Sequence, residues 1–513
     1  MDFSKTYLGI EFGSTRIKAC LVDENANTLA KGGLDWQNEY DGKYFTYSLD
    51  DAKRGLTECY TSLVKELGES PELFGAIGIS GMMHGYLAFD EEWNLLVPFR
   101  TWRNTTAECA AAKLRALFGF NIPARWSIAH LYQAMLDGEE HLPRLKHLTT
   151  LSGYIHFLLT GRHELGVCEA SGMFPITDGT YDTEMVKKFN DAALALGYAI
   201  DIEDILPSVR VAGESGARLT KDGARLLDVS GKLKEGTPLC PPEGDGGTGM
   251  VATNAVRVGT GNVSAGTSVF GMLVLDKPLS RLYPEIDIIM TPSGEPVAMA
   301  HCNNGCSELD GWVNIFAEFA ELFGIDLTKD DLYKKLYENA LGADSDCGEV
   351  ISYNFLASEP VAEVSGGAPM IFRTRSSNLN LKNLFRSQLY SAVAPLAIGM
   401  DILFKNEGYR ANRFMAHGGL FKVEGVAQGI LADALGCSVS ISETAGEGGA
   451  YGMALLAAYT VLGNDEKLCD WLDGDVFKNS ISKTVEPTKD STRGFSKFMK
   501  LYKTGLEAQR AIN

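Results

Sequence analysis

The chain carries two short turns whose residue types suit phosphate binding. Gly13-Ser14-Thr15 and Gly266-Thr267-Ser268 each follow a largely apolar run. Such turns offer backbone N–H groups and hydroxyls to phosphate oxygens, and glycine lets the backbone approach a ligand closely. One such turn is weak evidence, because hairpins use these residues routinely. Two equivalent turns facing each other across a cleft could hold one polyphosphate from both sides.

A third glycine element has a different setting. Gly418-Gly419 stands between a short apolar strand and a segment, 423–435, whose apolar residues recur at helical spacing. At such a junction a flat ring or a phosphate can lie close to the backbone. The pattern is neither a Walker A loop nor G-x-G-x-x-G, so the two commonest nucleotide folds are not supported. We expect the glycine-rich segment 443–459 to close the other side of the same pocket.

Two acidic residues stand in unusual places. Asp245 lies among glycines in PEGDGGTGM, and Glu11 lies inside an apolar strand two residues before Gly13. The ordinary interpretations are a solvated turn for Asp245 and a water-facing edge strand for Glu11. As chemistry, a carboxylate like Asp245 in an interdomain cleft could take the proton of an attacking hydroxyl. Beside a phosphate site, magnesium would balance the charge of Glu11.

Strands and helices must position these residues. Alternating apolar runs predict a meander of three strands, followed by a helix and a further strand. The strands cover 8–10, 17–22, 29–34 and 76–80, and the helix covers 49–67. Strands, then a helix, then a strand are typical of an α/β domain.

The two halves of the chain share this arrangement. Gly13 and Gly266 each precede an aspartate, Asp23 or Asp276, by ten residues, which indicates a duplicated domain. The segment 234–262 between the halves is dense in glycine and proline, as at a domain crossing. We therefore predict three parts, namely residues 1–253, residues 254–462, and a polar segment with a closing helix over 463–513.

Composition limits the partners. The 513 residues include 47 basic and 66 acidic side chains, giving a net charge of -19, which disfavours nucleic acid and anionic membranes. The first residues lack the charged and apolar regions of a leader, and no uninterrupted apolar stretch reaches the roughly 18 residues of a membrane span. Ten cysteines are scattered singly, as expected of reduced thiols. We expect a soluble, cytoplasmic protein that acts on small molecules.

Eight segments, in the same order and over nearly the whole chain, resemble the motifs of the FGGY carbohydrate kinases. They read GIEFGSTRIKA, GISGMMHGYLAFD, FRTWRNTTAE, LTGRHELGVCEASG, GTPLCPPEGDGGTGM, SAGTS, AHGGLFKVEGVAQGILADALG and AGEGGAYGMALLA. The set is far more specific than any one of its members. The GMMHG segment and the following tryptophan loop are most similar to those of xylulokinases and related pentulose kinases.

The resemblance implies an α/β fold of two ribonuclease-H-like lobes, as in actin and hexokinase, with ATP, Mg²⁺ and an open-chain sugar meeting in a central cleft. The N-terminal lobe would carry the sugar and first phosphate motifs, and the C-terminal lobe the second phosphate and nucleoside motifs. The implied reaction transfers the γ-phosphate of ATP to a terminal hydroxyl of a small sugar, such as the pentuloses xylulose and ribulose. Family members often dimerise, so a homodimer is expected.

The resemblance also implies roles for individual residues. It places the catalytic base on Asp245, which would touch the sugar and, with Glu11, hold Mg²⁺, in part through water. The remaining assignments are the first phosphate motif on Gly13, Ser14, Thr15 and Lys18, the second on Gly266, Thr267 and Ser268, the nucleoside motif on Gly418 and Gly419, and sugar contacts on Met83, His84, Trp102 and Arg103. Taken alone, His84 is more often a core histidine with satisfied nitrogens.

Two departures from the family pattern leave alternatives open. Glu11 stands where most members have aspartate. Asn104 stands in the tryptophan loop, two residues after Trp102, where many members have aspartate. If Asn104 lies near the sugar, the recognised hydroxyl pattern differs from that of D-xylulose. The alternatives are a kinase for another ketose or a polyol, and an actin-like ATPase or nucleotide switch without sugar turnover.

Overall fold

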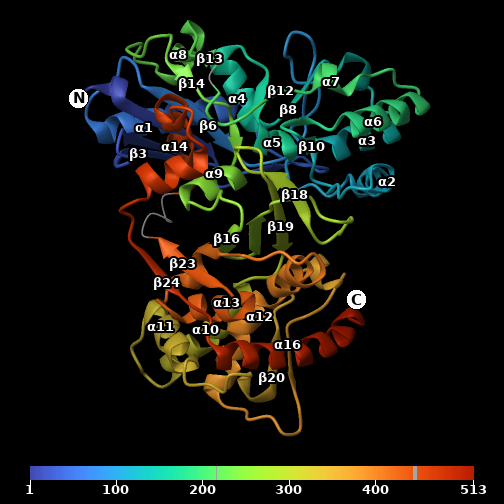
Figure 1. Cartoon of the computed structure of the whole chain (residues 1–513), viewed down its shortest axis with the longest axis vertical. Coiled ribbons are helices and arrows are strands. Elements are labelled where there is room, and N and C mark those ends of the chain that lie inside the picture. The colour runs from blue at the N-terminus through green and yellow to red at the C-terminus, as the bar shows by residue number, and fades with distance from the viewer. Residues whose placement is uncertain (215, 443–447, 513) are drawn as a thin grey trace. The chain divides into compact units, whose positions relative to one another are not determined.

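The computed structural model describes residues 1–214, 216–442 and 448–512 (Figure 1). The chain folds into two compact units. Unit 1 comprises Met1–Arg257, Ile288–Val297 and Glu447–Asn479, and unit 2 comprises Val258–Asp287, Ala298–Gly446 and Ser480–Asn513. The predicted boundaries stay a prediction, and the two units differ from them mainly in residues 447–479, which group with unit 1.

Unit 1 is built on a sheet with the strand order β13-β14-β6-β1-β2-β3, and β15 also pairs with β6. β1 is antiparallel to β2 and parallel to β6, and β2 is antiparallel to β3. The four strands predicted from the sequence fall within β1, β2, β3 and β6 and are confirmed. The bounds are β1 Thr6–Phe12, β2 Arg16–Asp23, β3 Thr28–Asp35, β6 Ala76–Gly81, β13 Ala217–Arg218, β14 Pro238–Leu239 and β15 Glu243–Gly244.

Two helices pack on this sheet and bury it. α1 (Leu49–Leu67) packs against β2 and β3, and it begins at Ser48 and ends at Gly68, which takes a left-handed φ of 79°. α14 (Gly448–Leu462) packs against β1 and β6. A side chain at Gly9 would meet the Ala450 carbonyl oxygen at 2.2 Å, so glycine permits this close approach. Every residue of β1, including Glu11, is therefore buried.

Shorter elements complete unit 1. Its other helices are α2 Glu108–Phe118, α3 Ser127–Asp137, α4 Leu151–Thr160, α5 Val167–Ser171, α6 Thr183–Ala195, α7 Ile202–Ile205, α8 Lys221–Leu227, α9 Asp245–Ala252 and α15 Leu468–Trp471. Its small sheets use β4 Glu39–Tyr40, β5 Phe45–Thr46, β7 Leu87–Phe89, β8 His147–Thr149, β9 Glu164–Gly166, β10 Ile176–Thr177, β11 Thr180–Tyr181 and β12 Ser208–Arg210.

Unit 2 repeats the arrangement of strands. The second seven-stranded sheet has the order β18-β19-β17-β16-β22-β23-β24, with β16 antiparallel to β17 and parallel to β22. The strands β17, β16, β22, β23 and β24 belong to unit 2, whereas most of β18 and the first residues of β19 fall in the segment Ile288–Val297 that groups with unit 1. β16 thus corresponds to β1, and the turn before β17 corresponds to the turn before β2, which confirms the predicted duplication. The bounds are β16 Thr260–Ala265, β17 Val269–Val274, β18 Asp287–Met290, β19 Pro296–Cys302, β22 Arg413–His417, β23 Ser438–Ser442 and β24 Ser482–Val485.

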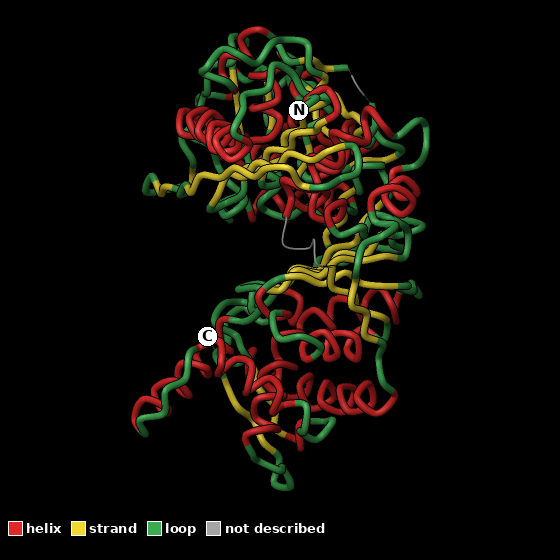
Figure 2. Tube along the Cα trace, turned by 90° about the vertical axis from the view of Figure 1, so that its left-hand side faces the viewer, coloured by secondary structure: helices red, strands yellow, loops and turns green. Residues whose placement is uncertain are grey.

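Helices cover the sheet of unit 2 (Figure 2). They are α10 Ser307–Leu322, α11 Lys329–Ala340, α12 Leu381–Asp401, α13 Val426–Leu435 and the closing helix α16 Lys489–Arg510, and a separate hairpin pairs β20 Val350–Tyr353 with β21 Met370–Arg373. Among the described residues, one helix, Leu381–Asn406, is long and apolar enough to cross a membrane. Its apolar window is 78% buried within the protein, as in the core helix of a globular domain.

Candidate active site

An ion pair flanks the first phosphate turn. Glu11 and Lys18 are opposite each other in the β1–β2 register, and Lys18 Nζ lies 3.3 Å from Glu11 Oε2. The turn between these two residues is fixed by hydrogen bonds to its carbonyl groups. Trp36 donates to the Gly13 carbonyl at 2.7 Å, and Tyr47 donates to the Ser14 carbonyl at 2.6 Å. The side chains of Ser14 and Thr15 remain exposed. The turn is therefore rigid and open to a ligand.

The first described residues of α14 also meet this ion pair. A Cβ atom at Gly449 would lie 2.6 Å from Glu11 Oε1, and one at Gly448 would lie 3.5 Å from Lys18 Nζ. The glycines at positions 448 and 449 thus leave room for both side chains, and Lys18 balances the charge of the buried Glu11. Segment 443–459, expected to close the pocket of Gly418 and Gly419, is only partly described, because residues 443–447 lie outside the described residues. Its described part packs within unit 1 beside Glu11, and the expectation stays a prediction.

Asp245 is the first residue of α9. Its Oδ1 accepts a hydrogen bond from the Met83 backbone N–H at 3.2 Å. The pKa of Asp245 is raised to about 6, mainly by burial and in smaller part by the negative charge of Glu11. The residue is nevertheless accessible to solvent, so a substrate can reach its carboxylate. A carboxylate with these properties suits proton acceptance near neutral pH.

Two buried acids lie close to Asp245 and were missed by the sequence analysis. Glu169 and Glu243 are 0% and 1% exposed, and the Glu169 backbone N–H donates to Glu243 Oε2 at 3.0 Å. Burial raises the pKa of Glu243 to about 8 and that of Glu169 well above its usual range. Burial thus favours the protonated form of both acids. Their only sequence signal is their position within the motifs GVCEASG and PPEGDGG.

The predicted sugar residues Met83 and His84 are brought next to Asp245. His84 is 5% exposed and has a left-handed φ of 69°, a strained conformation that concentrates at functional sites. Its Nδ1 lies 3.0 Å from the Gly172 carbonyl oxygen, which can only accept. Nδ1 therefore carries a proton and donates it to this carbonyl oxygen. The ring stacks on buried Trp126 with centroids 6.1 Å apart.

The tryptophan loop is held by Asn104. Asn104 Oδ1 accepts from the Phe45 N–H and Asn104 Nδ2 donates to the Phe45 carbonyl, both at 2.8 Å. Asn104 is 3% exposed, and both ends of its amide bind the Phe45 backbone, so in this structure its side chain holds the loop. Trp102 is 38% exposed, and the Arg103 guanidinium lies 4.3 Å above the Phe45 ring.

The second phosphate turn and the nucleoside motif lie together in unit 2. A cavity of about 870 Å³ is lined by Gly266, Thr267 and Gly419, and it has the size of a nucleotide site. The start of α10 holds the turn, because the Cys306 N–H donates to the Gly266 carbonyl at 2.9 Å. Gly418 has a φ of 110°, and a side chain there would meet the Ala265 carbonyl oxygen at 2.2 Å. The other side chains around the cavity come mainly from α10 and α11 and include Asp310, Asp330, Tyr333, Lys334 and Tyr337.

Comparison with known proteins identifies the class. Residues 6–251 match the N-terminal domain of the FGGY family of carbohydrate kinases, and residues 261–461 match the C-terminal domain of that family. The fold is accordingly that of a two-domain sugar kinase. The chain belongs to the FGGY family of carbohydrate kinases.

The relatives include two kinds of sugar kinase. The chain is 24% identical over 440 residues to a xylulose kinase of Haemophilus influenzae, covering 80% of this chain and 82% of the relative. It is 22% identical over 520 residues to a gluconokinase of Bacillus licheniformis, covering 96% and 94%.

Solved structures share the fold. A ligand-bound xylulose kinase from Lactobacillus acidophilus is 17% identical and superposes with a TM-score of 0.80 over 98% of each chain. A Plasmodium falciparum glycerol kinase with ADP is 14% identical, with a TM-score of 0.79 over 98% of each chain. Membership of the FGGY family makes the protein a phosphotransferase that uses ATP as phosphoryl donor and an alcohol group of a small sugar as acceptor.

Proposed function

We propose that this kinase phosphorylates a terminal hydroxyl of a pentulose such as xylulose or ribulose. The observation that carries the proposal is the hydrogen bond from the Met83 N–H to Asp245, which puts the sugar residues Met83 and His84 beside the base. The relative from Haemophilus influenzae, named a xylulose kinase, supports the same substrate class. The relatives named gluconokinases favour a sugar acid as the second candidate.

In the proposed reaction Asp245 accepts the proton of the attacking sugar hydroxyl. The resulting oxygen nucleophile attacks the γ-phosphorus, and the bond to the β-phosphate oxygen breaks in line with the attack. His84, next to Met83 in the chain, is assigned to contact the sugar and so to orient it. Because the pKa of Asp245 is about 6, most of this carboxylate is ionised at pH 7.5 and ready to accept the proton.

The phosphate groups are assigned to the two turns. The donors are backbone N–H groups, hydroxyls and one ammonium group. They belong to Gly13, Ser14, Thr15 and Lys18 in unit 1 and to Gly266, Thr267 and Ser268 in unit 2. The cavity lined by Gly419 takes the nucleoside, with Gly418 allowing the backbone to lie close to it. These donors bind the triphosphate and orient its γ-phosphate.

The carboxylates of this chain fit a magnesium ion that is bound together with ATP. Among residues 1–214, 216–442 and 448–512 no group of three or more histidine, cysteine or acidic side chains could enclose a metal. Mg²⁺ in kinases needs only one or two carboxylates besides phosphates and waters. Glu11 and Asp245 would hold it, in part through water, and Mg²⁺ would supply positive charge that offsets the phosphate charge.

Location and assembly stay part of the proposal. A cytoplasmic location is supported by the ten scattered cysteines and by a supply of ATP and small sugars there. A homodimer is supported by the resemblance to the family alone.

The substrate is tested by measuring ADP release with a panel of D- and L-xylulose, D- and L-ribulose, D-fructose, D-gluconate, glycerol and a sample without sugar. We expect kcat/KM to be highest for one pentulose, with little ADP release in the sample without sugar. A maximum for gluconate would establish the second candidate. Equal ADP release with and without every sugar would indicate an ATPase and contradict the proposal.

A further inference from the structure

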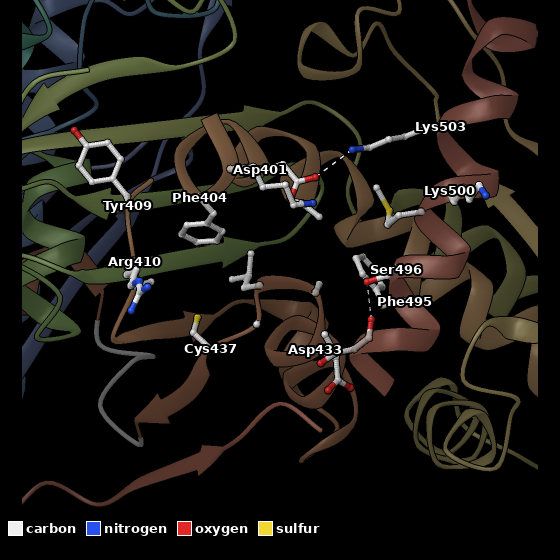
Figure 3. A pocket seen from close by; sticks show the side chains of 18 residues that line it. Asp401, Phe404, Tyr409, Arg410, Asp433, Cys437, Phe495, Ser496, Lys500 and Lys503 are labelled. Atoms are coloured by element: carbon white, nitrogen blue, oxygen red, sulfur yellow. Dashed lines mark hydrogen bonds and ion pairs between the residues drawn. The ribbon is translucent and has the colours of Figure 1, made fainter. Parts of the chain in front are cut away.

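Unit 2 contains a second cavity that the kinase reaction does not use. It has a volume of about 600 Å³ and lies among the end of α12, the segment 402–411, the end of α13 and α16 (Figure 3). It shares no lining residue with the cavity that contains Gly266 and Gly419. Its volume falls in the range of small-molecule sites.

The interior of this cavity is partly apolar. Phe404, Leu435, Phe495 and Met499 line it from three different elements. In Figure 3 the ring of Phe404 lies between Arg410 and the Asp401–Lys503 pair. An organic ligand would therefore have an apolar surface to pack against in the middle of the cavity and polar groups at its edges.

The cationic side chains outnumber the acids. The cavity is lined by four cationic side chains, Lys405, Arg410, Lys500 and Lys503, and by only two acidic side chains, Asp401 and Asp433. Lys405 and Lys503 share the single carboxylate of Asp401, at 2.8 and 3.1 Å. Within the part of the chain that the structure describes, Arg410 and Lys500 form no ion pair. This surplus of positive charge stands out in a chain whose net charge is -19.

Asp433 does not cancel the surplus. Asp433 is 8% exposed, and its Oδ1 accepts a hydrogen bond from the Thr488 backbone N–H at 2.8 Å. The carboxylate is therefore already bound to the backbone of this chain. The positive groups at the rim are therefore available to an anion.

We propose that this cavity binds a small organic phosphate, with its phosphate at Arg410 and its apolar part against Phe404 and Phe495, while the lysines on the other side of Phe404 add positive potential to the cavity. A planar guanidinium donates two parallel hydrogen bonds to a phosphate, and the lysines add point charges. The site is separate from the proposed nucleotide and sugar residues, so it can be present whether or not the proposed sugar is correct.

The test is calorimetric titration of the full chain with 1-naphthyl phosphate, 1-naphthol and inorganic phosphate, each in the presence of saturating ADP to occupy the nucleotide cavity. Both parts of the ligand contribute in this proposal. We expect 1-naphthyl phosphate to bind at least tenfold more tightly than either 1-naphthol or inorganic phosphate. Equal affinity for 1-naphthyl phosphate and 1-naphthol would overturn the role of the cations, and absence of 1-naphthyl phosphate binding would overturn the site.

Variants locate the binding. Arg410→Gln should weaken 1-naphthyl phosphate at least tenfold, and Lys503→Gln should weaken it severalfold. The matched control is Lys497→Gln, also on α16, because Lys497 does not line the cavity and pairs instead with Asp346. It should change the affinity less than twofold. The sugar kinase rate should be unchanged in all three variants, which also shows that they are folded. Binding that none of the cavity variants alters would place the ligand elsewhere and contradict the proposal.

Discussion

Glu11 and Lys18 face each other across the β1–β2 hairpin, with Lys18 Nζ 3.3 Å from Glu11 Oε2. The pair explains an acid in a fully buried strand, because the Lys18 ammonium group balances the charge of the Glu11 carboxylate. The longer side chain of glutamate reaches the space where Gly449 leaves room for it. The ion pair thus lies directly beside the turn that we assign to phosphate.

If Glu11 helps to hold magnesium, its charge should set the magnesium requirement. Glu11→Gln should raise the Mg²⁺ concentration for half-maximal activity roughly tenfold or more, the usual cost of losing a metal partner. Glu11→Asp keeps the charge and should have a smaller effect. Activity is measured against Mg²⁺ concentration at saturating ATP. An unchanged requirement in Glu11→Gln would reject the metal role.

Gly418 should be needed for nucleotide binding. Alanine there would place a Cβ 2.2 Å from the Ala265 carbonyl oxygen at a φ of 110°, so the turn must move. We expect Gly418→Ala to lower ADP affinity at least tenfold in calorimetry. Gly436→Ala is the matched control, since it also has a left-handed φ, 67°, but no atom within 4 Å. The free energy of unfolding of the control should fall by about 1 kcal/mol, while its ADP affinity stays unchanged. Equal losses of ADP affinity in both variants would contradict the assignment.

Asn104 should act on the tryptophan loop rather than on the sugar. An aspartate at this position cannot donate to the Phe45 carbonyl, which Asn104 Nδ2 does at 2.8 Å. Asn104→Asp should therefore lower the free energy of unfolding by about 1–3 kcal/mol, measured by urea denaturation, and should raise KM for the sugar. Unchanged stability together with a new sugar preference would show instead that residue 104 faces the substrate.

The buried Glu359 predicts a pH dependence of stability. Burial raises its pKa to about 7, although Asn304 donates two hydrogen bonds to its Oε2. The unfolded chain, with a glutamate pKa of 4.5, binds fewer protons between pH 4.5 and 7. The free energy of unfolding should therefore fall as the pH rises through this window, by on the order of 2–3 kcal/mol. Glu359→Gln should lose this part of the slope in denaturation curves from pH 5 to 8, and an identical slope would refute the protonated carboxyl.

Local sequence patterns predicted most of the fold. The strands β1, β2, β3 and β6 and the helix α1 follow from alternating or helical apolar spacing, and the repeated turns predicted the duplication. Long-range packing could not be predicted in this way. α14 is apolar on all sides, so its sequence does not indicate that it packs beside Glu11 in unit 1.

The residue types alone indicated the glycine turns, Asp245 and Glu11, whereas the sugar residues of the candidate site were predicted from the resemblance. Asp245, Met83 and His84 are far apart in the sequence, and only the fold brings Met83 to Asp245. Glu169 and Glu243 were missed because an acid buried by tertiary packing looks like any other acid in the sequence. The partner of Asn104 could not be predicted from local sequence, because the Phe45 backbone is 59 residues away.

The central claim is that Asp245 is the base of a sugar kinase, and Asp245→Asn tests it most directly. The variant keeps the size of the side chain and an oxygen that can accept from the Met83 N–H, but it cannot take up the sugar proton. We predict that sugar-dependent ADP release falls at least a thousandfold, while ADP affinity measured by calorimetry stays within twofold of the parent protein. Equal sugar-dependent ADP release by the variant and the parent protein would contradict the account.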